Sequence, residues 1–155
     1  MAPSGITERS TSRRLRSLQM SKVRSKDTAP EMAVRKLVFS LGYRYRLHVK
    51  TIRGRPDLVF PSQRKVIFVH GCFWHRHRDC KKATTPASNT DYWIPKFTRT
   101  VQRDKETLAI LAAQGWKSLI VWECELKHIN NVVKKLKAFL KSRPSPRASS
   151  KVHST

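Results

Sequence analysis

Acidic residues are scarce in this chain of 155 residues, which has 10 Asp and Glu against 33 Lys and Arg and a net charge of +23. A net charge of about 2–8 keeps a small domain soluble, so this excess favours a polyanionic partner. Nucleic acid fits better than a membrane surface, because the sequence lacks a lipidation motif and a long apolar run. A basic surface that serves only solubility is the alternative interpretation.

Cysteine is also rare, with three residues in the whole chain, which excludes a dense disulfide framework. The N-terminal segment is polar and basic and lacks the apolar core of a signal peptide. We therefore expect a cytoplasmic protein in a reducing compartment, whose cysteines are thiols or metal ligands.

Composition along the chain predicts one folded domain between two basic tails. Residues 1–26 hold seven Lys or Arg and one Glu, which indicates either a flexible arm that follows phosphates or a solubilising tail. Residues 27–141 carry the apolar periodicity of a folded domain. Residues 142–155 are rich in Ser, Pro and Arg, and we expect them to be disordered.

Within the domain, apolar spacing predicts helices and strands in alternation. Asp27 or Thr28 is a suitable cap for the first helix, and Ile129, Val132 and Leu136 are expected to face the core from the last one. Helices are predicted at residues 30–42, 91–113 and 126–140, and strands at residues 43–48, 58–60, 65–69 and 116–122.

The segment 54–80 concentrates the polar residues that carry chemistry, in the motifs GRPDLVF, KVIFV and HGCFWHRHRDC. Asp57 opens one predicted strand, and His70 directly follows the next. Hydrolysis of a phosphodiester needs an oxygen-rich cation site and a proton acceptor, and Asp57 with a nearby histidine would supply them through Mg²⁺ and an activated water. An ordinary turn residue is the alternative for Asp57.

Three other features each have two interpretations. His75, His77 and Cys80 have local metal-ligand spacing, with Cys72, Cys124 or later acids as further ligands of a zinc ion; free thiols and surface histidines are the alternative. Adjacent aromatic residues at 73 and 74 are suited to wedge between bases, or to pack with one ring partly exposed. Acidic residues at 31 and 104 suit a site near a metal, or only a helix dipole and a surface ion pair.

These motifs occur in the order MSKVRSKDT, GRPDLVF, VIFVHGCFWH, VQRDK and SLIVWEC over about residues 18–141. In this combination the chain resembles the very-short-patch-repair (Vsr) endonucleases. The resemblance implies an α/β fold of the restriction-endonuclease type, with a mixed central sheet flanked by helices and a structural zinc site. It also implies a monomer that nicks double-stranded DNA 5′ to the thymine of a T:G mismatch, as left by deamination of 5-methylcytosine, alongside mismatch-repair proteins at the nucleoid.

The resemblance assigns catalytic roles residue by residue. Asp57 matches the acid that binds Mg²⁺, and His75 matches the catalytic histidine. Glu31 matches an acid that acts near the metal through water, and His70 lies close to this group. Val69 stands where the family offers a backbone carbonyl to Mg²⁺, and it lacks the hydroxyl of members that have threonine there.

The same resemblance assigns zinc to His77, Cys80, Asp104 and Cys124, and it leaves Cys72 as a buried thiol. Arg78 and Asp79 separate His77 from Cys80, where some members have a single residue, so Asp79 becomes a rival ligand. The DNA-binding residues that the resemblance implies are three aromatic side chains that intercalate beside the mismatch and two basic residues of the N-terminal arm: Phe73, Trp74, Trp93, Lys22 and Arg24.

Two other functions remain open at this stage. One is a related nuclease with a different lesion or site preference. The other is a DNA-binding module without catalysis, built on the same charge and aromatic residues. Asp57 and His75 separate these possibilities, because only an enzyme needs them.

Overall fold

A computed structural model describes residues 26–143 as a mixed α/β fold. The predicted arm and tail, with Lys22 and Arg24, lie outside the described residues apart from their innermost positions. The elements follow in the order α2 (Ala29–Ser40), β1 (Leu58–Phe60), η1 (Pro61–Gln63), β2 (Lys65–His70), α3 (Thr90–Ala113), β3 (Lys117–Trp122), η2 (Glu123–Lys127) and α4 (Ile129–Lys141).

The three strands form one mixed sheet in the order β1-β2-β3. Strands β1 and β2 are antiparallel, with Leu58 opposite Ile67, whereas β2 and β3 are parallel, with His70 opposite Trp122. Helix α3 makes the crossover between the two parallel strands, as a parallel pair requires. The loops that leave β2 and β3 therefore start side by side at one edge of the sheet, where the polar motifs lie.

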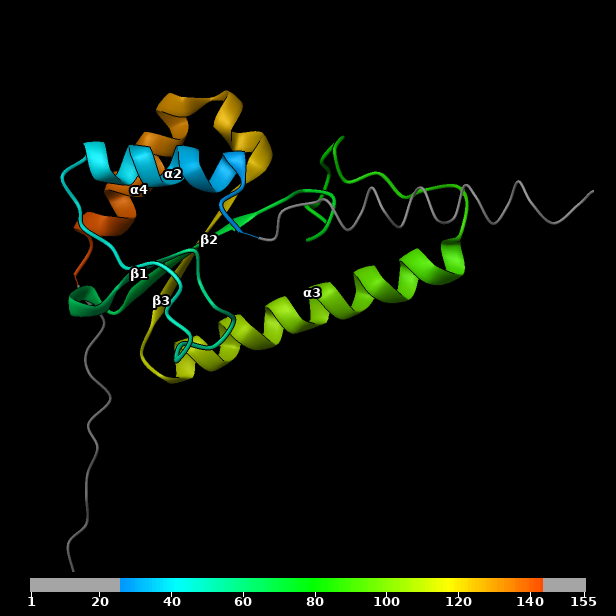
Figure 1. Ribbon diagram of the computed structural model, residues 1–155, viewed down its shortest axis with the longest axis horizontal. Coiled ribbons are helices and arrows are strands. Elements are labelled where there is room, and N and C mark those ends of the chain that lie inside the picture. Colours follow the sequence, from blue (N-terminus) through cyan, green and yellow to red (C-terminus); the bar gives the residue numbers. More distant parts are fainter. Residues whose placement is uncertain (1–25, 144–155) are drawn as a thin grey trace, which may run out of the picture.

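Helices cover both faces of the sheet (Figure 1). Helices α2 and α4 lie together on one face, and α3 runs across the other. The strand residues alternate between these two cores as the pleat requires, since Leu58 and Phe60 face α2 and α4 while Val59 faces α3. Each fully buried aliphatic side chain contributes about 2 kcal/mol to the hydrophobic stabilisation.

Most predicted elements are confirmed within a few residues. Thr28 caps α2, because its hydroxyl accepts a hydrogen bond from the Glu31 N–H at 3.4 Å. The strand predicted at residues 43–48 is wrong: its backbone makes one isolated bridge, between Arg46 and Val59. Strand β1 has only three residues to pair with, and His48 has a positive φ of 54° that ends the extended chain.

The last helix begins later than predicted, at Ile129, because Glu123–Lys127 forms a 3-10 turn. The Glu125 carboxylate accepts a hydrogen bond from the Trp122 N–H at 2.7 Å and fixes this turn. As a consequence Ile129 is 43% exposed, whereas Val132 and Leu136 are buried as expected. No helix between residues 26 and 143 has the length and apolar character needed to cross a membrane.

Lys65 is fully buried at the start of β2, which the sequence pattern did not indicate. Its ammonium group donates to the carbonyls of Leu140 and Ser142 at 3.1 and 2.6 Å, and to Gln63 Oε1 at 3.0 Å. These acceptors satisfy a buried cation and cap the C-terminal end of α4, where a positive charge is favourable.

Candidate functional site

A cavity of about 540 Å³ opens where β2 ends, and the predicted catalytic residues line it. It lies between the start of α2, the turn before β1, the end of β2 and the middle of α3. Its lining residues are Glu31, Arg53, Gly54, Arg55, Asp57, Phe68, Val69, His70, His75, Arg103, Asp104 and Thr107. Four short motifs that are distant in sequence therefore meet in one place.

Asp57 is held at this cavity by the antiparallel pairing of β1 with β2. Its backbone N–H donates to the Ile67 carbonyl at 3.0 Å, and its carboxylate accepts from the Val69 N–H at 2.6 Å. Burial raises the pKa of Asp57 to about 6, and the Glu31 carboxylate acts in the same direction, although the Val69 N–H and Arg35 oppose it. A cation beside Asp57 would relieve this cost, which is the property of a metal-binding carboxylate.

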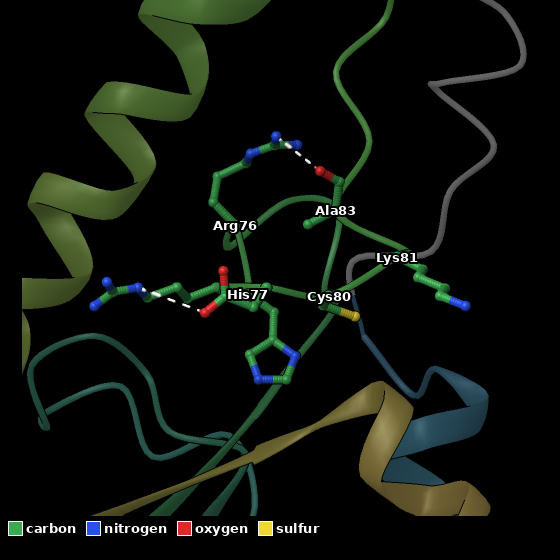
Figure 2. Close-up of a pocket in the computed structure, with 7 residues that line it drawn as sticks. Arg76, His77, Cys80, Lys81 and Ala83 are labelled. Carbon is green, nitrogen blue, oxygen red and sulfur yellow. Dashed lines mark hydrogen bonds and ion pairs between the residues drawn. The ribbon is translucent and has the colours of Figure 1, made fainter.

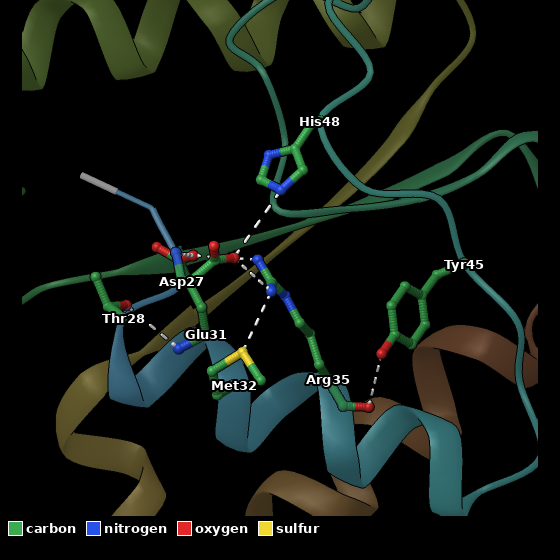
Figure 3. Close-up of polar contacts among 7 residues, drawn as sticks. All are labelled: Asp27, Thr28, Glu31, Met32, Arg35, Tyr45 and His48. Atoms are coloured by element: carbon green, nitrogen blue, oxygen red, sulfur yellow. Dashed lines mark hydrogen bonds and ion pairs between the residues drawn. The ribbon is translucent and has the colours of Figure 1, made fainter. Parts of the chain in front are cut away.

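Glu31 is held by a network of polar contacts at the start of α2 (Figure 3). Its carboxylate accepts from the Asp27 N–H at 2.8 Å and lies 3.4 Å from the Arg35 guanidinium. Arg35 also contacts the Asp27 carboxylate at 2.7 Å, and the side chains of Glu31 and Arg35 are both buried. Glu31 is therefore fixed by specific contacts in addition to the helix dipole. Arg35 was not predicted as a partner of Glu31, although a spacing of four residues on a helix favours such a pair.

His75 is oriented by two neighbours. Its Nδ1 lies 2.6 Å from Asp104 Oδ2, and its ring stacks on the ring of His70 at 3.7 Å with an interplanar angle of 9°. Burial, together with the neighbouring His75, lowers the pKa of His70 to about 4, so His70 is neutral at pH 7. The contact with Asp104 engages Nδ1 and leaves Nε2 as the nitrogen that can take a proton, which is the arrangement of a carboxylate-oriented general base.

Asp104 was predicted among the zinc ligands, and the structure places it elsewhere. Its carboxylate groups with His70 and His75, while the second cluster of donors consists of Cys72, His77, Cys80 and Cys124. Within each cluster the ligand atoms lie within 4.8 Å of one another. Asp104 lies in the middle of α3 and lines the cavity, where its carboxylate contacts His75. Cys72, which was predicted to be an ordinary buried thiol, is buried and lies in the second cluster, beside His77, Cys80 and Cys124.

The Cys/His cluster joins the loop after β2 to the turn after β3. His77 Nδ1 lies 3.3 Å from Cys124 Sγ and 3.7 Å from Cys72 Sγ, and its ring stacks on Trp122 at 4.2 Å. Burial raises the pKa of the Cys72 thiol to about 12, so a bound cation would be needed to draw off its proton. Asp79 is 92% exposed and stands outside the cluster.

The aromatic residues predicted to contact DNA form one surface beside the cavity. Phe73 and Trp74 lie 5.6 and 5.9 Å from Trp93, and all three remain partly exposed. Phe97 is buried beneath Phe73, at 5.2 Å. Phe97 and Lys96 were not predicted to belong to this surface, although both follow Trp93 at helical spacing. The Lys96 ammonium group lies 5.2 Å from the centre of the Trp74 ring. Because these rings pack against one another, both Phe73 and Trp74 are held in place by neighbouring aromatic side chains.

Comparisons with known proteins identify the family of this chain. The family profile described as DNA mismatch endonuclease Vsr matches residues 10–82. Over 135 residues the chain is 49% identical to the type II nicking enzyme V.XorIIP of Xanthomonas oryzae pv. oryzae, covering 87% of this chain and 98% of that enzyme. It is 43% identical over 129 residues to the type II nicking enzyme V.NmeAIP of Neisseria meningitidis serogroup A, covering 79% of this chain and 91% of that enzyme.

A third relative carries the family's own name. The chain is 40% identical over 112 residues to the DNA mismatch endonuclease Vsr of Escherichia coli, covering 72% of this chain and 71% of that enzyme. The identity and coverage of these relatives are high enough to settle the family. The chain belongs to the Vsr family of DNA mismatch endonucleases, and it is an endodeoxyribonuclease.

Proposed function

We propose that this endonuclease nicks one DNA strand 5′ to the thymine of a T:G mismatch, by Mg²⁺-dependent hydrolysis of the phosphodiester, in very short patch repair. The observation that carries the proposal is the meeting of two acids, the half-buried Asp57 and the buried Glu31, with an oriented base, His75 beside Asp104, in one cavity. The mixed sheet with helices on both faces fits a fold of the restriction-endonuclease type.

The donors at the cavity fit Mg²⁺. This ion prefers hard oxygen ligands in octahedral geometry and keeps several waters. Asp57 would supply a carboxylate and Val69 its backbone carbonyl, while Glu31, held by Arg35, would act through water. Bound there, Mg²⁺ would supply positive charge against the charge that develops on the phosphoryl oxygens.

The proton transfer falls to His75. Nε2 of His75 would accept a proton from the attacking water, and Asp104 would stabilise the imidazolium that results. His70 would keep the ring of His75 in place through its stacked, neutral ring. The cationic side chains of Arg53, Arg55 and Arg103 line the same cavity and favour entry of a phosphate.

The second cluster fits a structural Zn²⁺. Three thiols and an imidazole are a common tetrahedral donor set for structural zinc. We assign it to Cys72, His77, Cys80 and Cys124, with Cys72 in place of Asp104. A zinc ion there would tie the loop after β2 to the turn after β3, and so would hold His75, two residues from His77, at the cavity.

Phe73, Trp74 and Trp93 would enter the DNA beside the mismatch. Unstacking costs about a few kcal/mol per step and least at a mispair, so an aromatic wedge would favour mismatched DNA. The basic arm, with Lys22 and Arg24, would add phosphate contacts from another side, and mismatch-repair proteins would act on the nick. We expect the enzyme to act as a monomer at the nucleoid.

The test is strand scission of a T:G duplex beside a matched T:A duplex, with Mg²⁺ and with EDTA. The proposal requires a Mg²⁺-dependent nick 5′ to the mismatched thymine that is absent from the matched duplex. A nick of equal rate in both duplexes would contradict it.

A second candidate is the same chemistry in a different sequence context. Two relatives named above are type II nicking enzymes, a name that does not mention mismatches. Repeating the assay with varied bases around the T:G pair would show the preferred context. Membership of an endonuclease family disfavours a DNA-binding module without catalysis.

A further inference from the structure

Arg76 stands between the two histidines that serve different clusters, in a backbone conformation that glycine adopts more readily. Its φ is +54°. The turn around it is closed by hydrogen bonds from the His75 N–H to the Gly71 carbonyl and from the His77 N–H to the Cys72 carbonyl, both 3.1 Å. Because Arg76 has this left-handed conformation, the turn ends there and the chain changes direction. As a result, the side chain of His75 contacts Asp104, whereas that of His77 contacts the cysteines.

The side chain of Arg76 explains why arginine occupies this strained position. Its guanidinium donates to the carbonyls of Ala83 and Thr84 and to the hydroxyl of Thr85, each at 2.9 Å. Figure 2 shows this side chain reaching across to Ala83. Its Cζ also lies 4.1 Å from the centre of the Phe97 ring. Only a planar fork of several N–H donors can make these contacts together, and lysine cannot.

The other contacts of the surrounding loop lead toward the turn after β3: Lys82 pairs with Glu123 at 2.7 Å, and His77 lies 3.3 Å from Cys124. Residues from Arg76 to Ala83 line an open hollow of about 560 Å³ (Figure 2). Arg78, in the same loop, is 94% exposed and pairs only loosely with Asp79, at 3.7 Å. The contacts of Arg76 run in a different direction, since they join the turn to residues 83–85 and to Phe97 on α3.

We propose that Arg76 is a positioning residue that fixes the aromatic surface relative to His75. It joins the turn carrying Phe73, Trp74 and His75 to the ring of Phe97, on which Phe73 and Trp93 pack at 5.2 and 5.6 Å. This inference rests on the proposed function, in which that surface enters the mismatch while His75 acts at the cut. With Arg76 in place, insertion of the aromatic surface into the DNA would also align His75 with the phosphodiester that is cut.

The experiment uses the full zinc-loaded chain and a T:G duplex with 2-aminopurine next to the mismatch. Binding is read as the rise in 2-aminopurine fluorescence on unstacking, and cleavage as the single-turnover nicking rate with Mg²⁺. Arg76→Gly relaxes the backbone and removes the side chain, whereas Arg76→Lys keeps the charge. Arg78→Gly is the matched control, since it removes the same charge from an exposed position of the same loop.

We expect Arg76→Gly and Arg76→Lys to lose most of the fluorescence rise and to nick at least about tenfold more slowly, because small displacements of reacting groups are costly. Arg78→Gly should stay within about twofold of the parent chain, since it makes no contact with the aromatic surface. Nicking by Arg76→Gly within about twofold of the parent, with a full fluorescence rise, would overturn the assignment.

Two further measurements keep the result interpretable. Zinc content and thermal unfolding show whether Arg76→Gly is folded. If it is not, Thr85→Ala replaces it: this variant removes one acceptor, and its slowing of the nick should disappear in the Arg76→Lys background. An equal effect in both backgrounds would refute the link. If the parent chain itself neither nicks nor raises the fluorescence at T:G, the proposed function fails, and this inference fails with it.

Discussion

Two groups of titratable side chains lie beyond the end of β2, one around His75 and one around His77, and they differ in their donor atoms and in their surroundings. The group around His75 contains carboxylates and imidazoles in a cavity. The group around His77 contains three thiols and one imidazole, joined across two loops. Oxygen donors with an open cavity suit a hard, exchangeable cation and catalysis, whereas thiolates suit a soft, structural one.

The comparison shows that local spacing does not assign a ligand to a metal. His75 and His77 are two residues apart in one turn, yet Arg76 separates them into different sites. Asp104 was predicted to lie with the cysteines, but it lies with His70 and His75. Cys72 was predicted to stand apart, but it lies with His77, Cys80 and Cys124, because the direction of each side chain decides which group it joins.

The largest expected effect is the loss of nicking when Asp57, one of the residues that line the cavity, is replaced. Asp57→Asn keeps the size of the side chain and an acceptor for the Val69 N–H but removes the negative charge. Losing a ligand that holds the metal costs several kcal/mol of transition-state stabilisation, so nicking should fall by at least about 10³-fold. Zinc content should not change, because Asp57 lies outside the Cys/His group. Single-turnover nicking and metal analysis of the same sample check both parts, and a variant that nicks at half the parent rate would remove Asp57 from the mechanism.

The next effect is a pH dependence of stability that arises from Asp57 in the cavity. The folded pKa of Asp57 is about 6, above its ordinary value of 3.8, so between these two values the folded state holds a proton that the unfolded state has released. The stabilising contribution of protonated Asp57 is therefore fully present below pH 3.8 and is lost as the pH rises through 6. The total loss is at most about 3 kcal/mol.

Denaturant unfolding of the parent chain and of Asp57→Asn between pH 4 and 7.5, without Mg²⁺, checks this linkage. The stability difference should grow in favour of Asn as the pH rises, since the amide has no charge to bury. His70 also titrates, with a pKa lowered to about 4, but it is present in both proteins and cancels. If the difference in unfolding free energy between the two proteins does not change with pH, the pKa of Asp57 is not raised by folding.

A smaller effect tests how the cavity is held against α3. A Cβ on Gly54 would lie 2.3 Å from Thr107 Cγ2, and Gly54 also has a positive φ of 78°. Gly42 is the matched control, because its φ is 88° and a Cβ there would meet nothing within 4 Å. Gly42→Ala should cost about 1 kcal/mol from backbone strain, and Gly54→Ala about 1–3 kcal/mol more from the clash. Equal losses of stability in Gly42→Ala and Gly54→Ala would mean that the turn before β1 can shift to relieve the clash with Thr107.

Much of the fold was predictable because it depends on local pattern. Apolar runs located β1, β2 and β3, and a suitable cap followed by helical spacing located α2. Asp57 and His70 were expected near each other because each stands at an end of a strand in one sheet. This expectation needs only the pairing of neighbouring strands.

The rest depended on tertiary geometry. Asp104 is 29 residues from His75, and the rotation of α3 about its own axis, which points Asp104 at the cavity, is not a local signal. Lys65 is a buried charge whose acceptor at Leu140 is 75 residues away, so its position in the sequence looked like an ordinary surface site. The segment 43–48 has the alternation of a strand, but it lacks a long enough neighbour to pair with.

The central claim is the division of the donors into two groups, and zinc analysis of Asp104→Ala tests it most directly. If Asp104 orients His75, this variant retains the zinc content of the parent chain and nicks at least about 10²-fold more slowly, while Cys72→Ser loses zinc. If Asp104 were a zinc ligand, Asp104→Ala would lose the metal and Cys72→Ser would retain it. That result would contradict the account.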